Sequence, residues 1–273
     1  MECWSNGKRD RSFSSTPFPQ YSIAPVLRLS VVNDLTVIIS TFNEEGTIVP
    51  CLERIAAVAP EAEVLIVHGG RDRTAAVASE YARTHDGLRL RVLENYGDSG
   101  KGHAIKVGIS LASHPLQLQF DADLQFAPED ILAMLAPLRE GRADVVVGSR
   151  FMKGADRSGY AFSFFRDVGN TILNRFISIM AGTEISDVTT GMKAWTREAI
   201  WEIRFKDNRF VYEMEIVMRA ARKGLRIVQI PVKYSSRQGG HSGHGTGAKE
   251  FKSIVATGAS IAWRALLIRV GCW

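Results

Sequence analysis

Two carboxylates and an amide stand at alternate positions in Asp121-Ala122-Asp123-Leu124-Gln125. The apolar run Leu116–Phe120 before them predicts a buried strand, and if the extended backbone continues, the three polar side chains project to one side. Such oxygen ligands suit Mg²⁺ or Mn²⁺, which leave coordination positions open for substrate phosphates. The segment therefore predicts a divalent-metal site that offsets charge on a departing diphosphate. The alternative is a solvated strand end with capping acids.

Alternating strands and helices are predicted to position this segment. The apolar and β-branched runs predict strands at 35–41, 63–67, 88–93, 116–121 and 144–149, and helical spacing predicts helices at 43–59, 72–83, 101–112 and 128–139. After Arg150 we expect helices at 164–181, 212–223 and 249–269 and strands at 192–195 and 226–234. This order indicates an α/β fold with a mostly parallel central sheet flanked by helices, whose ligands gather at the carboxyl ends of the strands.

Composition narrows the class of protein. The 273 residues are 45% hydrophobic and carry a net charge of +5, which suits acidic partners such as nucleotide-sugars, lipid phosphates or an anionic membrane surface. No dense basic stripe is present, so nucleic acid is not expected as a partner. The three cysteines are far apart and predict neither disulfides nor a thiolate zinc site, which favours a reducing compartment. No apolar stretch is long enough to span a membrane.

Five motifs in order resemble one family. They are Val37–Glu45, Gly100-Lys101-Gly102-His103-Ala104, Asp121–Gln125, Gly148-Ser149-Arg150-Phe151 and Asp187–Trp195. Together they resemble the family-2 glycosyltransferases of GT-A fold, and within these the dolichyl- or polyprenyl-phosphate mannose and glucose synthases. The resemblance covers residues 35–242, most of the chain.

The resemblance implies roles for individual residues. It places Thr41, Asn43, Glu44, Lys101, Asp121, Ala122 and Asp123 around a nucleotide-sugar donor, and makes Asp121, Asp123 and Gln125 ligands of Mg²⁺ or Mn²⁺. Arg150, with Arg166 less securely aligned, would face an acceptor phosphate, and Arg237 would belong to a late catalytic motif. Glu215, one helical step from Glu213, matches an acid that could orient Arg237, although helical acids are more often solvated or ion-paired.

This chain departs from the family pattern at two motif positions. His68 stands where the family has an aspartate that reads the nucleotide base; an imidazole can still make hydrogen bonds, so base contact is retained as a prediction while GDP and UDP stay open. Gly243 stands where the late motif has a lysine, and His241, His244 and Lys249 are nearby without being matched replacements. We expect the Gly/His-rich loop to be a mobile lid; a zinc site at the two histidines is the less favoured alternative.

The expected organisation has four parts. Residues 1–33 form a flexible leader, 34–236 the GT-A catalytic domain, 237–248 the mobile loop, and 249–273 an amphipathic helix. Lys252, Arg264 and Arg269 interrupt the apolar surface of that helix, which fits either an interfacial helix on a bilayer or a helix packed on the core. A cytoplasmic protein, with peripheral contact at the cytosolic face of a membrane, is expected.

These observations predict a metal-dependent, inverting glycosyltransferase that moves a hexosyl group from a GDP- or UDP-sugar to a polyprenyl phosphate. A hydroxyl acceptor, such as a saccharide, glycolipid or small metabolite, is the alternative, and it would require a base, for which Asp187 is the first candidate. A non-catalytic nucleotide-sugar binding protein is a third hypothesis, which the metal-ligand triad disfavours. A dinucleotide-dependent oxidoreductase is excluded because Thr41–Glu45 lacks the glycine fingerprint.

Overall fold

The computed structural model describes residues 33–85, 87–95, 99–160, 164–237 and 248–273. The expected leader lies outside these residues except for Asn33, and so does the expected Gly/His-rich loop except for its two end residues. All described helices and strands belong to one compact unit, Val31–Trp273. At residues 164–165 and 248–254 the structure describes the backbone only.

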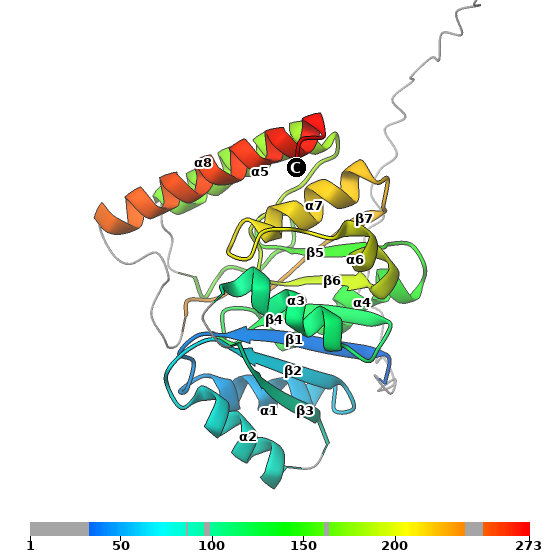
Figure 1. The fold of residues 1–273 in the computed structure, drawn as a ribbon, viewed down its shortest axis with the longest axis vertical. Coiled ribbons are helices and arrows are strands. Elements are labelled where there is room, and N and C mark those ends of the chain that lie inside the picture. The colour runs from blue at the N-terminus through cyan, green and yellow to red at the C-terminus, as the bar shows by residue number, and fades with distance from the viewer. Residues whose placement is uncertain (1–32, 86, 96–98, 161–163, 238–247) are drawn as a thin grey trace, which may run out of the picture. The chain divides into compact units, whose positions relative to one another are not determined.

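A seven-stranded sheet forms the centre of the described fold (Figure 1). Its order is β3-β2-β1-β4-β6-β5-β7. The strands are β1 (Leu35–Thr41), β2 (Glu63–His68), β3 (Arg89–Glu94), β4 (Leu116–Asp121), β5 (Val145–Ser149), β6 (Lys193–Thr196) and β7 (Ile227–Pro231). β1, β2, β4 and β5 are buried along almost their whole length, in agreement with their apolar and β-branched sequences. The expected mostly parallel α/β architecture is confirmed.

Strand register brings the ends of neighbouring strands together. Thr41 pairs with His68 across β1 and β2, and Ser40 pairs with Asp121 across β1 and β4. β7 runs parallel to β5, with Pro231 opposite Ser149. Side chains that follow β1, β4, β5 and β7 therefore emerge at one edge of the sheet, although those strands are far apart in sequence.

β6 runs antiparallel to both of its neighbours, β4 and β5. Its first residue, Lys193, pairs with Gln119 near the carboxyl end of β4 and with Val147 near that of β5. The loop that precedes β6 therefore lies at the same edge as the loops that follow the parallel strands. This reversal places the motif beginning at Asp187 beside the residues that follow β4 and β5.

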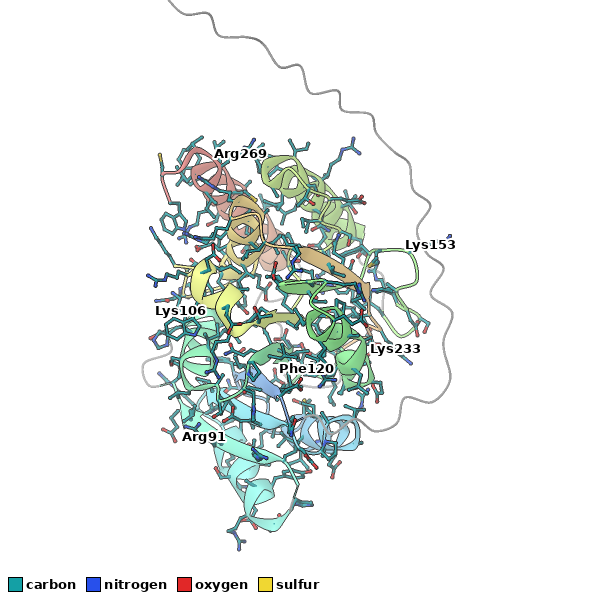
Figure 2. All side chains as sticks on the ribbon, turned by 90° about the vertical axis from the view of Figure 1, so that its right-hand side faces the viewer. Arg91, Lys106, Phe120, Lys153, Lys233 and Arg269 are labelled. Atoms are coloured by element: carbon teal, nitrogen blue, oxygen red, sulfur yellow. The ribbon has the colours of Figure 1, made fainter. Side chains whose placement is uncertain are left out.

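Helices cover both faces of the sheet. One face carries α1 (Ile48–Val58), α2 (Thr74–Thr84) and α4 (Ile131–Arg139), the last preceded by a 3₁₀ turn at Pro128–Asp130. The other face carries α3 (Lys101–Leu111), α5 (Phe164–Ala181), α6 (Arg197–Ile203), α7 (Tyr212–Arg222) and α8 (Ala248–Val270). Each face has its own buried apolar cluster. Figure 2 shows Phe120 of β4 in the interior and Arg269 at the periphery.

Two local expectations differ from the structure. The first helix begins at Ile48 instead of Asn43, because Asn43 has a φ of 58° and residues 44–47 form a turn. A left-handed backbone at Asn43 cannot continue a right-handed helix, and asparagine tolerates it better than most residues. Helix α6 was not predicted; Thr196 begins it by accepting a hydrogen bond from the Ala199 N–H (3.2 Å).

The last helix packs on the molecule and also presents apolar side chains outward. Ile261, Ala265 and Ile268 of α8 are buried at helical spacing in the second core cluster. α5 and α8 lie side by side at the β7 side of the sheet, with α7 next to them (Figure 1). The core-packed alternative for this helix is therefore observed. Among the described helices, none is long and apolar enough to cross a membrane.

Candidate active site

The metal-ligand segment turns directly after its strand. β4 ends at Asp121, and Leu124 has a φ of 60°, so the extended geometry assumed from the sequence does not persist through the segment. The turn is closed by Asp123 Oδ1, which accepts a hydrogen bond from the Gln125 N–H (3.1 Å). Gln125 Nε2 donates to the Ser235 carbonyl (3.3 Å). The two aspartates and Gln125 still line one cavity.

Lys101, the first residue of α3, connects the end of β4 with α7, which covers the same face of the sheet as α3. Its Nζ lies 2.9 Å from Asp121 Oδ1 and 3.0 Å from Glu213 Oε1 of α7. Burial acts to lower the pKa of Lys101, but the Asp121 and Glu213 carboxylates outweigh it and hold the pKa well above its ordinary value. Lys101 is therefore a permanent cation beside the first aspartate.

Arg237 is placed between two other acids of the site. Its Nη2 lies 2.7 Å from Asp123 Oδ2, and its Nη1 lies 3.2 Å from Glu44 Oε1. Burial, and after it the nearby Asp121 carboxylate, raise the pKa of Asp123 in spite of Arg237. Burial also raises the pKa of Glu44. The carboxylates of Glu44, Asp121 and Asp123 thus lie close together, and a bound cation would reduce the repulsion between them.

The aspartate pair suits a metal that completes its coordination with substrate oxygens. Among the described residues, no group of three or more His, Cys, Asp or Glu side chains is arranged as a metal site. Mg²⁺, however, needs only one or two protein carboxylates when phosphates supply further oxygens. Asp121 and Asp123 meet that requirement, since both line the same cavity and the Asp121 carboxylate is near enough to raise the pKa of Asp123.

A cavity of about 300 Å³ lies at the ends of β1 and β4. Its lining includes six residues that the family resemblance places around the donor: Thr41, Glu44, Lys101, Asp121, Ala122 and Asp123. Arg237 also lines it, as do Asn95, Arg209 and the aromatic residues Phe42 and Phe210. Elements far apart in sequence thus form one polar hollow with two aromatic side chains at its wall.

Two residues predicted to contact the donor, His68 and Asn43, are not among the residues that line this cavity, and both make contacts that support its surroundings. His68 is buried, and its Nδ1 lies 3.1 Å from Thr41 Oγ1, so it braces the threonine from behind. Asn43 Oδ1 accepts a hydrogen bond from the Arg71 N–H (3.0 Å), which fixes the loop after β2. Asn95, which sequence reasoning missed, lines the cavity; its Oδ1 lies 2.7 Å from His103 Nδ1.

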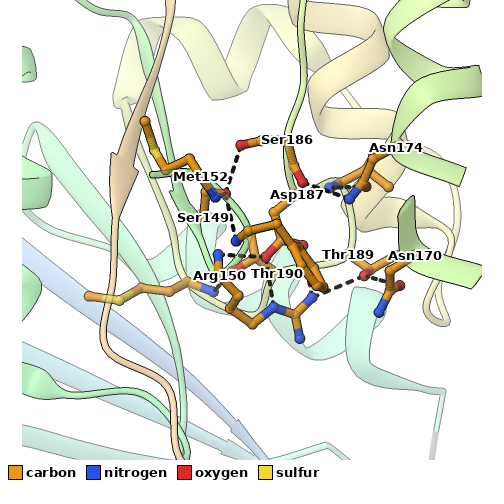
Figure 3. Close-up of polar contacts among 12 residues, drawn as sticks. Ser149, Arg150, Met152, Asn170, Asn174, Ser186, Asp187, Thr189 and Thr190 are labelled. Atoms are coloured by element: carbon orange, nitrogen blue, oxygen red, sulfur yellow. Dashed lines mark hydrogen bonds and ion pairs between the residues drawn. The ribbon is translucent and has the colours of Figure 1, made fainter. Parts of the chain in front are cut away.

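Arg150 follows β5 and is held by Asp187 from the loop before β6 (Figure 3). Its Nε lies 2.7 Å from Asp187 Oδ2, its Nη2 lies 2.8 Å from Oδ1, and its own backbone N–H donates to Oδ2 (3.0 Å). The guanidinium also stacks 5.1 Å from the centre of the Tyr234 ring. Both oxygens of the fully buried Asp187 are thus engaged in orienting Arg150.

A second cavity, of about 840 Å³, extends from Arg150 into the space between α5 and α8. Its polar end contains Asp121, Asp123, Arg150, Arg166 and Arg237. Its other walls are largely apolar, with Val168, Ile172, Leu173 and Phe176 from α5 and Val255, Gly258, Ile261 and Ala262 from α8. Lys101, Asp121, Asp123, Phe210 and Arg237 line both cavities. The two hollows therefore meet at the aspartate pair.

Gly191 brings the loop before β6 against the aspartates. A Cβ at this position would lie 1.9 Å from Asp121 Oδ2, so any side chain would displace the carboxylate. Two residues later, Lys193 is fully buried and its Nζ donates to the Thr190 carbonyl (2.5 Å). Burial lowers the pKa of Lys193 to about 8. The sequence marks this segment only through its family motif.

The acid that faces the site on α7 is Glu213 and not Glu215. Glu213 lines the larger cavity and pairs with Lys101. Glu215 is buried away from it, accepting hydrogen bonds from the Lys206 N–H (2.7 Å) and the Asp207 N–H (3.1 Å). Residues two positions apart on a helix do not lie on the same face, so these two acids point in different directions. His241, Gly243 and His244 lie outside the described residues.

Comparison with known proteins identifies the family. The model of the family described as "Glycosyl transferase family 2" matches residues 36–204, which contain both aspartates, Arg150 and the loop before β6. The chain belongs to glycosyl transferase family 2. It is therefore a glycosyltransferase, and the resemblance stated from the sequence motifs is confirmed.

Relatives and solved structures agree with this membership. The chain is 30% identical over 210 residues to a dolichyl-phosphate hexose transferase of Haloferax volcanii, covering 76% of this chain and 85% of the relative. It is 28% identical over 213 residues to a polyprenol monophosphomannose synthase of Mycolicibacterium smegmatis, covering 76% and 79%. Glucosyl-3-phosphoglycerate synthase of Mycobacterium tuberculosis, solved with Mn²⁺, UDP and glucosyl-3-phosphoglycerate, superposes with a TM-score of 0.67 at 17% identity, covering 91% and 86%. This last likeness shows the shared fold.

Proposed function

We propose that this glycosyltransferase moves a hexosyl group from a GDP- or UDP-sugar to a polyprenyl phosphate, with inversion and with Mg²⁺ or Mn²⁺. The observation that carries the proposal is the junction of two unlike cavities at Asp121 and Asp123. One cavity is small and lined mainly by polar and charged residues, and the other is large, with Arg150 and Arg166 at its polar end and mostly apolar walls beyond them. Two substrates that each carry phosphate, one of them with an apolar tail, match this pair of cavities.

The small cavity is assigned to the donor. Thr41, Glu44, Asn95 and Lys101 supply hydrogen-bonding and charged groups, and Phe42 supplies an apolar surface. When bound, the divalent ion would be held by Asp121 and Asp123, with Gln125 as the further predicted ligand, and would neutralise charge on the leaving diphosphate. Arg237 and Lys101 add fixed positive charge on either side of the aspartates. The protein's contribution is then mainly positioning and electrostatic stabilisation.

The large cavity is assigned to the acceptor. Arg150 and Arg166 lie at its polar end, and a guanidinium group can bind two phosphate oxygens at once. The walls from α5 and α8 offer a prenyl chain a surface that a free sugar or a small phosphorylated metabolite would not need. Relatives at 30% and 28% identity are named for transfer involving dolichyl phosphate and polyprenol, which supports the same class.

The position of Asp187 favours a phosphate acceptor over a hydroxyl acceptor. A phosphate monoester already carries its nucleophilic charge, whereas a hydroxyl requires a base to remove its proton. Asp187, the first candidate for such a base, is fully buried and gives both oxygens to Arg150. Its position suits it to hold the arginine that would meet the acceptor phosphate.

Peripheral contact with a membrane forms part of the proposal. Ile172 and Ile179 of α5 are 65% and 64% exposed, and Trp263 and Val270 of α8 are 61% and 62% exposed. These two helices also wall the acceptor cavity, so a bilayer touching them would deliver a lipid to its mouth. The expectation of a cytoplasmic protein at the cytosolic face of that membrane stays a prediction.

The deciding experiment pairs a nucleotide-sugar panel with a polyprenyl phosphate in detergent, with and without Mn²⁺. We expect a lipid-linked sugar from one donor, formed only with metal, and lost in Asp123→Ala. Equal turnover of wild type and Asp123→Ala would overturn the metal role. Donor consumption without lipid product from any donor would favour the hydroxyl acceptor.

A variant that fills the apolar cavity tests the acceptor assignment. Gly258 lines that cavity, and a Cβ there meets no other atom within 4 Å. We expect Gly258→Phe to raise the KM for a long polyprenyl phosphate at least about tenfold, equivalent to about 1.4 kcal/mol, while donor hydrolysis is unchanged. Ala256→Phe, at an exposed position on the same helix, is the matched control. An unchanged KM in Gly258→Phe would contradict the assignment.

A further inference from the structure

The segment Phe205–Val211 is built against the start of α3. The His103 N–H donates to the Asn208 carbonyl (3.0 Å), and the Gly102 N–H donates to the Arg209 carbonyl (3.1 Å). These are amide groups of the first helical turn, which find no partner within their own helix. A Cβ at Gly102 would lie 2.6 Å from the Asp207 carbonyl oxygen, so the glycine permits this close approach. The position of the segment and that of the start of α3 are therefore fixed together.

This contact bears directly on the donor cavity. Lys101, which pairs with Asp121 and Glu213, is the first residue of α3. Arg209 and Phe210 of the segment line the donor cavity themselves. Lys106, one turn further along α3, adds a hydrogen bond from its Nζ to Asn208 Oδ1 (2.8 Å; Figure 2 labels this lysine). A shift of the segment would move both a wall of the cavity and the lysine beside the aspartates.

Two buried acids hold the segment from within. Asp207 Oδ1 accepts hydrogen bonds from the Arg209 N–H (2.7 Å) and the Val211 N–H (3.2 Å). Glu215 accepts from the backbone N–H groups of Lys206 and Asp207. Both carboxylates therefore need positive partners to offset the cost of their burial.

The carboxyl-terminal part of the chain supplies partners for both acids. Arg264 of α8 forms an ion pair with Asp207 Oδ2. Trp273, just beyond α8, donates from Nε1 to Glu215 Oε1 (2.9 Å). The Arg264 guanidinium also lies 4.6 Å from the centre of the Trp273 ring, so the two residues support each other. Arg219 of α7 gives Glu215 a further ion pair (3.1 Å).

We propose that Arg264 and Trp273 are positioning residues for the donor site, acting through Asp207, Glu215 and the segment Phe205–Val211. Helix α8 thereby serves both substrates. Val255, Gly258 and Ala262 are among its residues that wall the acceptor cavity, and Arg264, farther along the helix, pairs with Asp207 in the segment that walls the donor cavity. This inference rests on the proposed assignment of the small cavity to a nucleotide-sugar.

Nucleotide binding without acceptor tests this role. Binding of UDP and of GDP in the presence of Mn²⁺ is measured by calorimetry for wild type, Arg264→Gln and Trp273→Phe, the second of which keeps an aromatic ring at this position and removes the N–H donor. We expect Kd to rise about five- to twentyfold in Arg264→Gln, in the range typical of coupling between sites. Arg264→Lys, which keeps the charge, should recover part of the affinity. Arg269→Gln, at an exposed position of the same helix, should bind as wild type does (Figure 2).

Steady-state kinetics separate positioning from loss of structure. In Arg264→Gln the KM for the nucleotide-sugar should rise while the KM for the acceptor stays within twofold, because Arg264 is placed at the donor wall. Should Arg264→Gln fail to fold, Trp273→Phe decides by the same two measurements. Unchanged nucleotide Kd in a folded Arg264→Gln, or an equal change in Arg269→Gln, overturns this inference alone. Failure of the wild type to bind either nucleotide overturns the donor assignment and this inference with it.

Discussion

Arg237 bridges Asp123 and Glu44, with its two terminal nitrogens 2.7 Å and 3.2 Å from their carboxylate oxygens. Asp123 follows β4, Glu44 follows β1 and Arg237 follows β7, so the bridge closes a ring of loops around the donor cavity. If the small cavity holds the nucleotide-sugar, as proposed, the Arg237 guanidinium lies where negative charge would develop on the leaving diphosphate.

We expect Arg237→Gln to lower kcat about 100-fold, the usual loss when one fixed hydrogen-bond donor to a developing charge is removed. Initial rates at saturating donor and acceptor give this number. Lys233→Gln removes an exposed cation from the segment that follows β7 and serves as the control (Figure 2). A loss below about threefold in Arg237→Gln would show that its role is limited to the bridge itself.

Metal affinity should fall on acidification at a higher pH than for ordinary aspartates. Burial and Asp121 raise the pKa of Asp123 above its ordinary 3.8, and burial raises that of Glu44. Protons therefore compete with the metal as the pH falls through these raised pKa values. Below the pKa of Asp123, the affinity for Mn²⁺ should drop about tenfold per pH unit. Calorimetric titration with Mn²⁺ from pH 7 downward measures the decline.

The same pKa shift predicts how the metal-free protein responds to pH. Native Asp123 keeps its proton where the unfolded chain has lost it, so this group makes the free energy of unfolding decrease as the pH rises from about 3.8 through the folded pKa. Asp123→Asn should remove that contribution. Urea unfolding at several pH values gives the comparison, and parallel curves for the two proteins would contradict it.

The Arg150–Asp187 pair should matter for stability as well as for acceptor binding. Asp187→Ala leaves a largely buried guanidinium without its partner, and we expect the free energy of unfolding to fall by about 3–5 kcal/mol. Asp187→Asn, which keeps one accepting oxygen, should lose less stability but raise the KM for the acceptor. Asp156→Ala removes a half-exposed aspartate whose ion pair with Lys233 is 3.8 Å long, and should cost under about 1 kcal/mol. Denaturant unfolding that ranks Asp187→Ala with Asp156→Ala would refute the buried pair's importance.

Lys193 should give the protein extra stability at alkaline pH. Burial lowers its pKa from 10.5 to about 8, so between these values the unfolded chain binds a proton that the native protein has released. The free energy of unfolding therefore rises with pH across this window, and Lys193→Met should lack that rise. Thermal or urea unfolding from pH 7.5 to 10.5 reports it. Identical pH profiles for both proteins would contradict a lowered pKa.

Much of the fold was predictable because it depends on local patterns. The expected ranges of all seven strands agree with the observed ones to within a few residues, and helical spacing predicts α5 and α8 almost to the residue. The first helix was predicted to begin too early, because a turn with Asn43 in a left-handed conformation resembles a helix start in sequence. α6, whose 7 residues make only about two turns before Arg204, was too short to give a periodic signal.

Site residues within one motif could be named from the sequence, but their contacts could not. Asp187 was proposed as a base from its motif, and the structure shows its two oxygens engaged with Arg150. The packing of β3 and α7 brings Asn95 and Glu213 to the site, and no local sequence pattern indicates that position. His68 took a position behind Thr41 because the register of β1 and β2 sets them side by side.

By itself the sequence determined the family and the alternation of strands and helices, and it singled out Asp121–Gln125 as the segment proposed to bind metal, since each depends on residues close together in the chain. The tertiary structure decided that β6 runs antiparallel between β4 and β5, which brings Asp187 to Arg150 and Gly191 to Asp121. It also decided that the cavities meet at the aspartates and that α8 reaches Asp207. Contacts between residues distant in sequence depend on which strands pair and which helices pack, and these choices are made by burial over the whole chain.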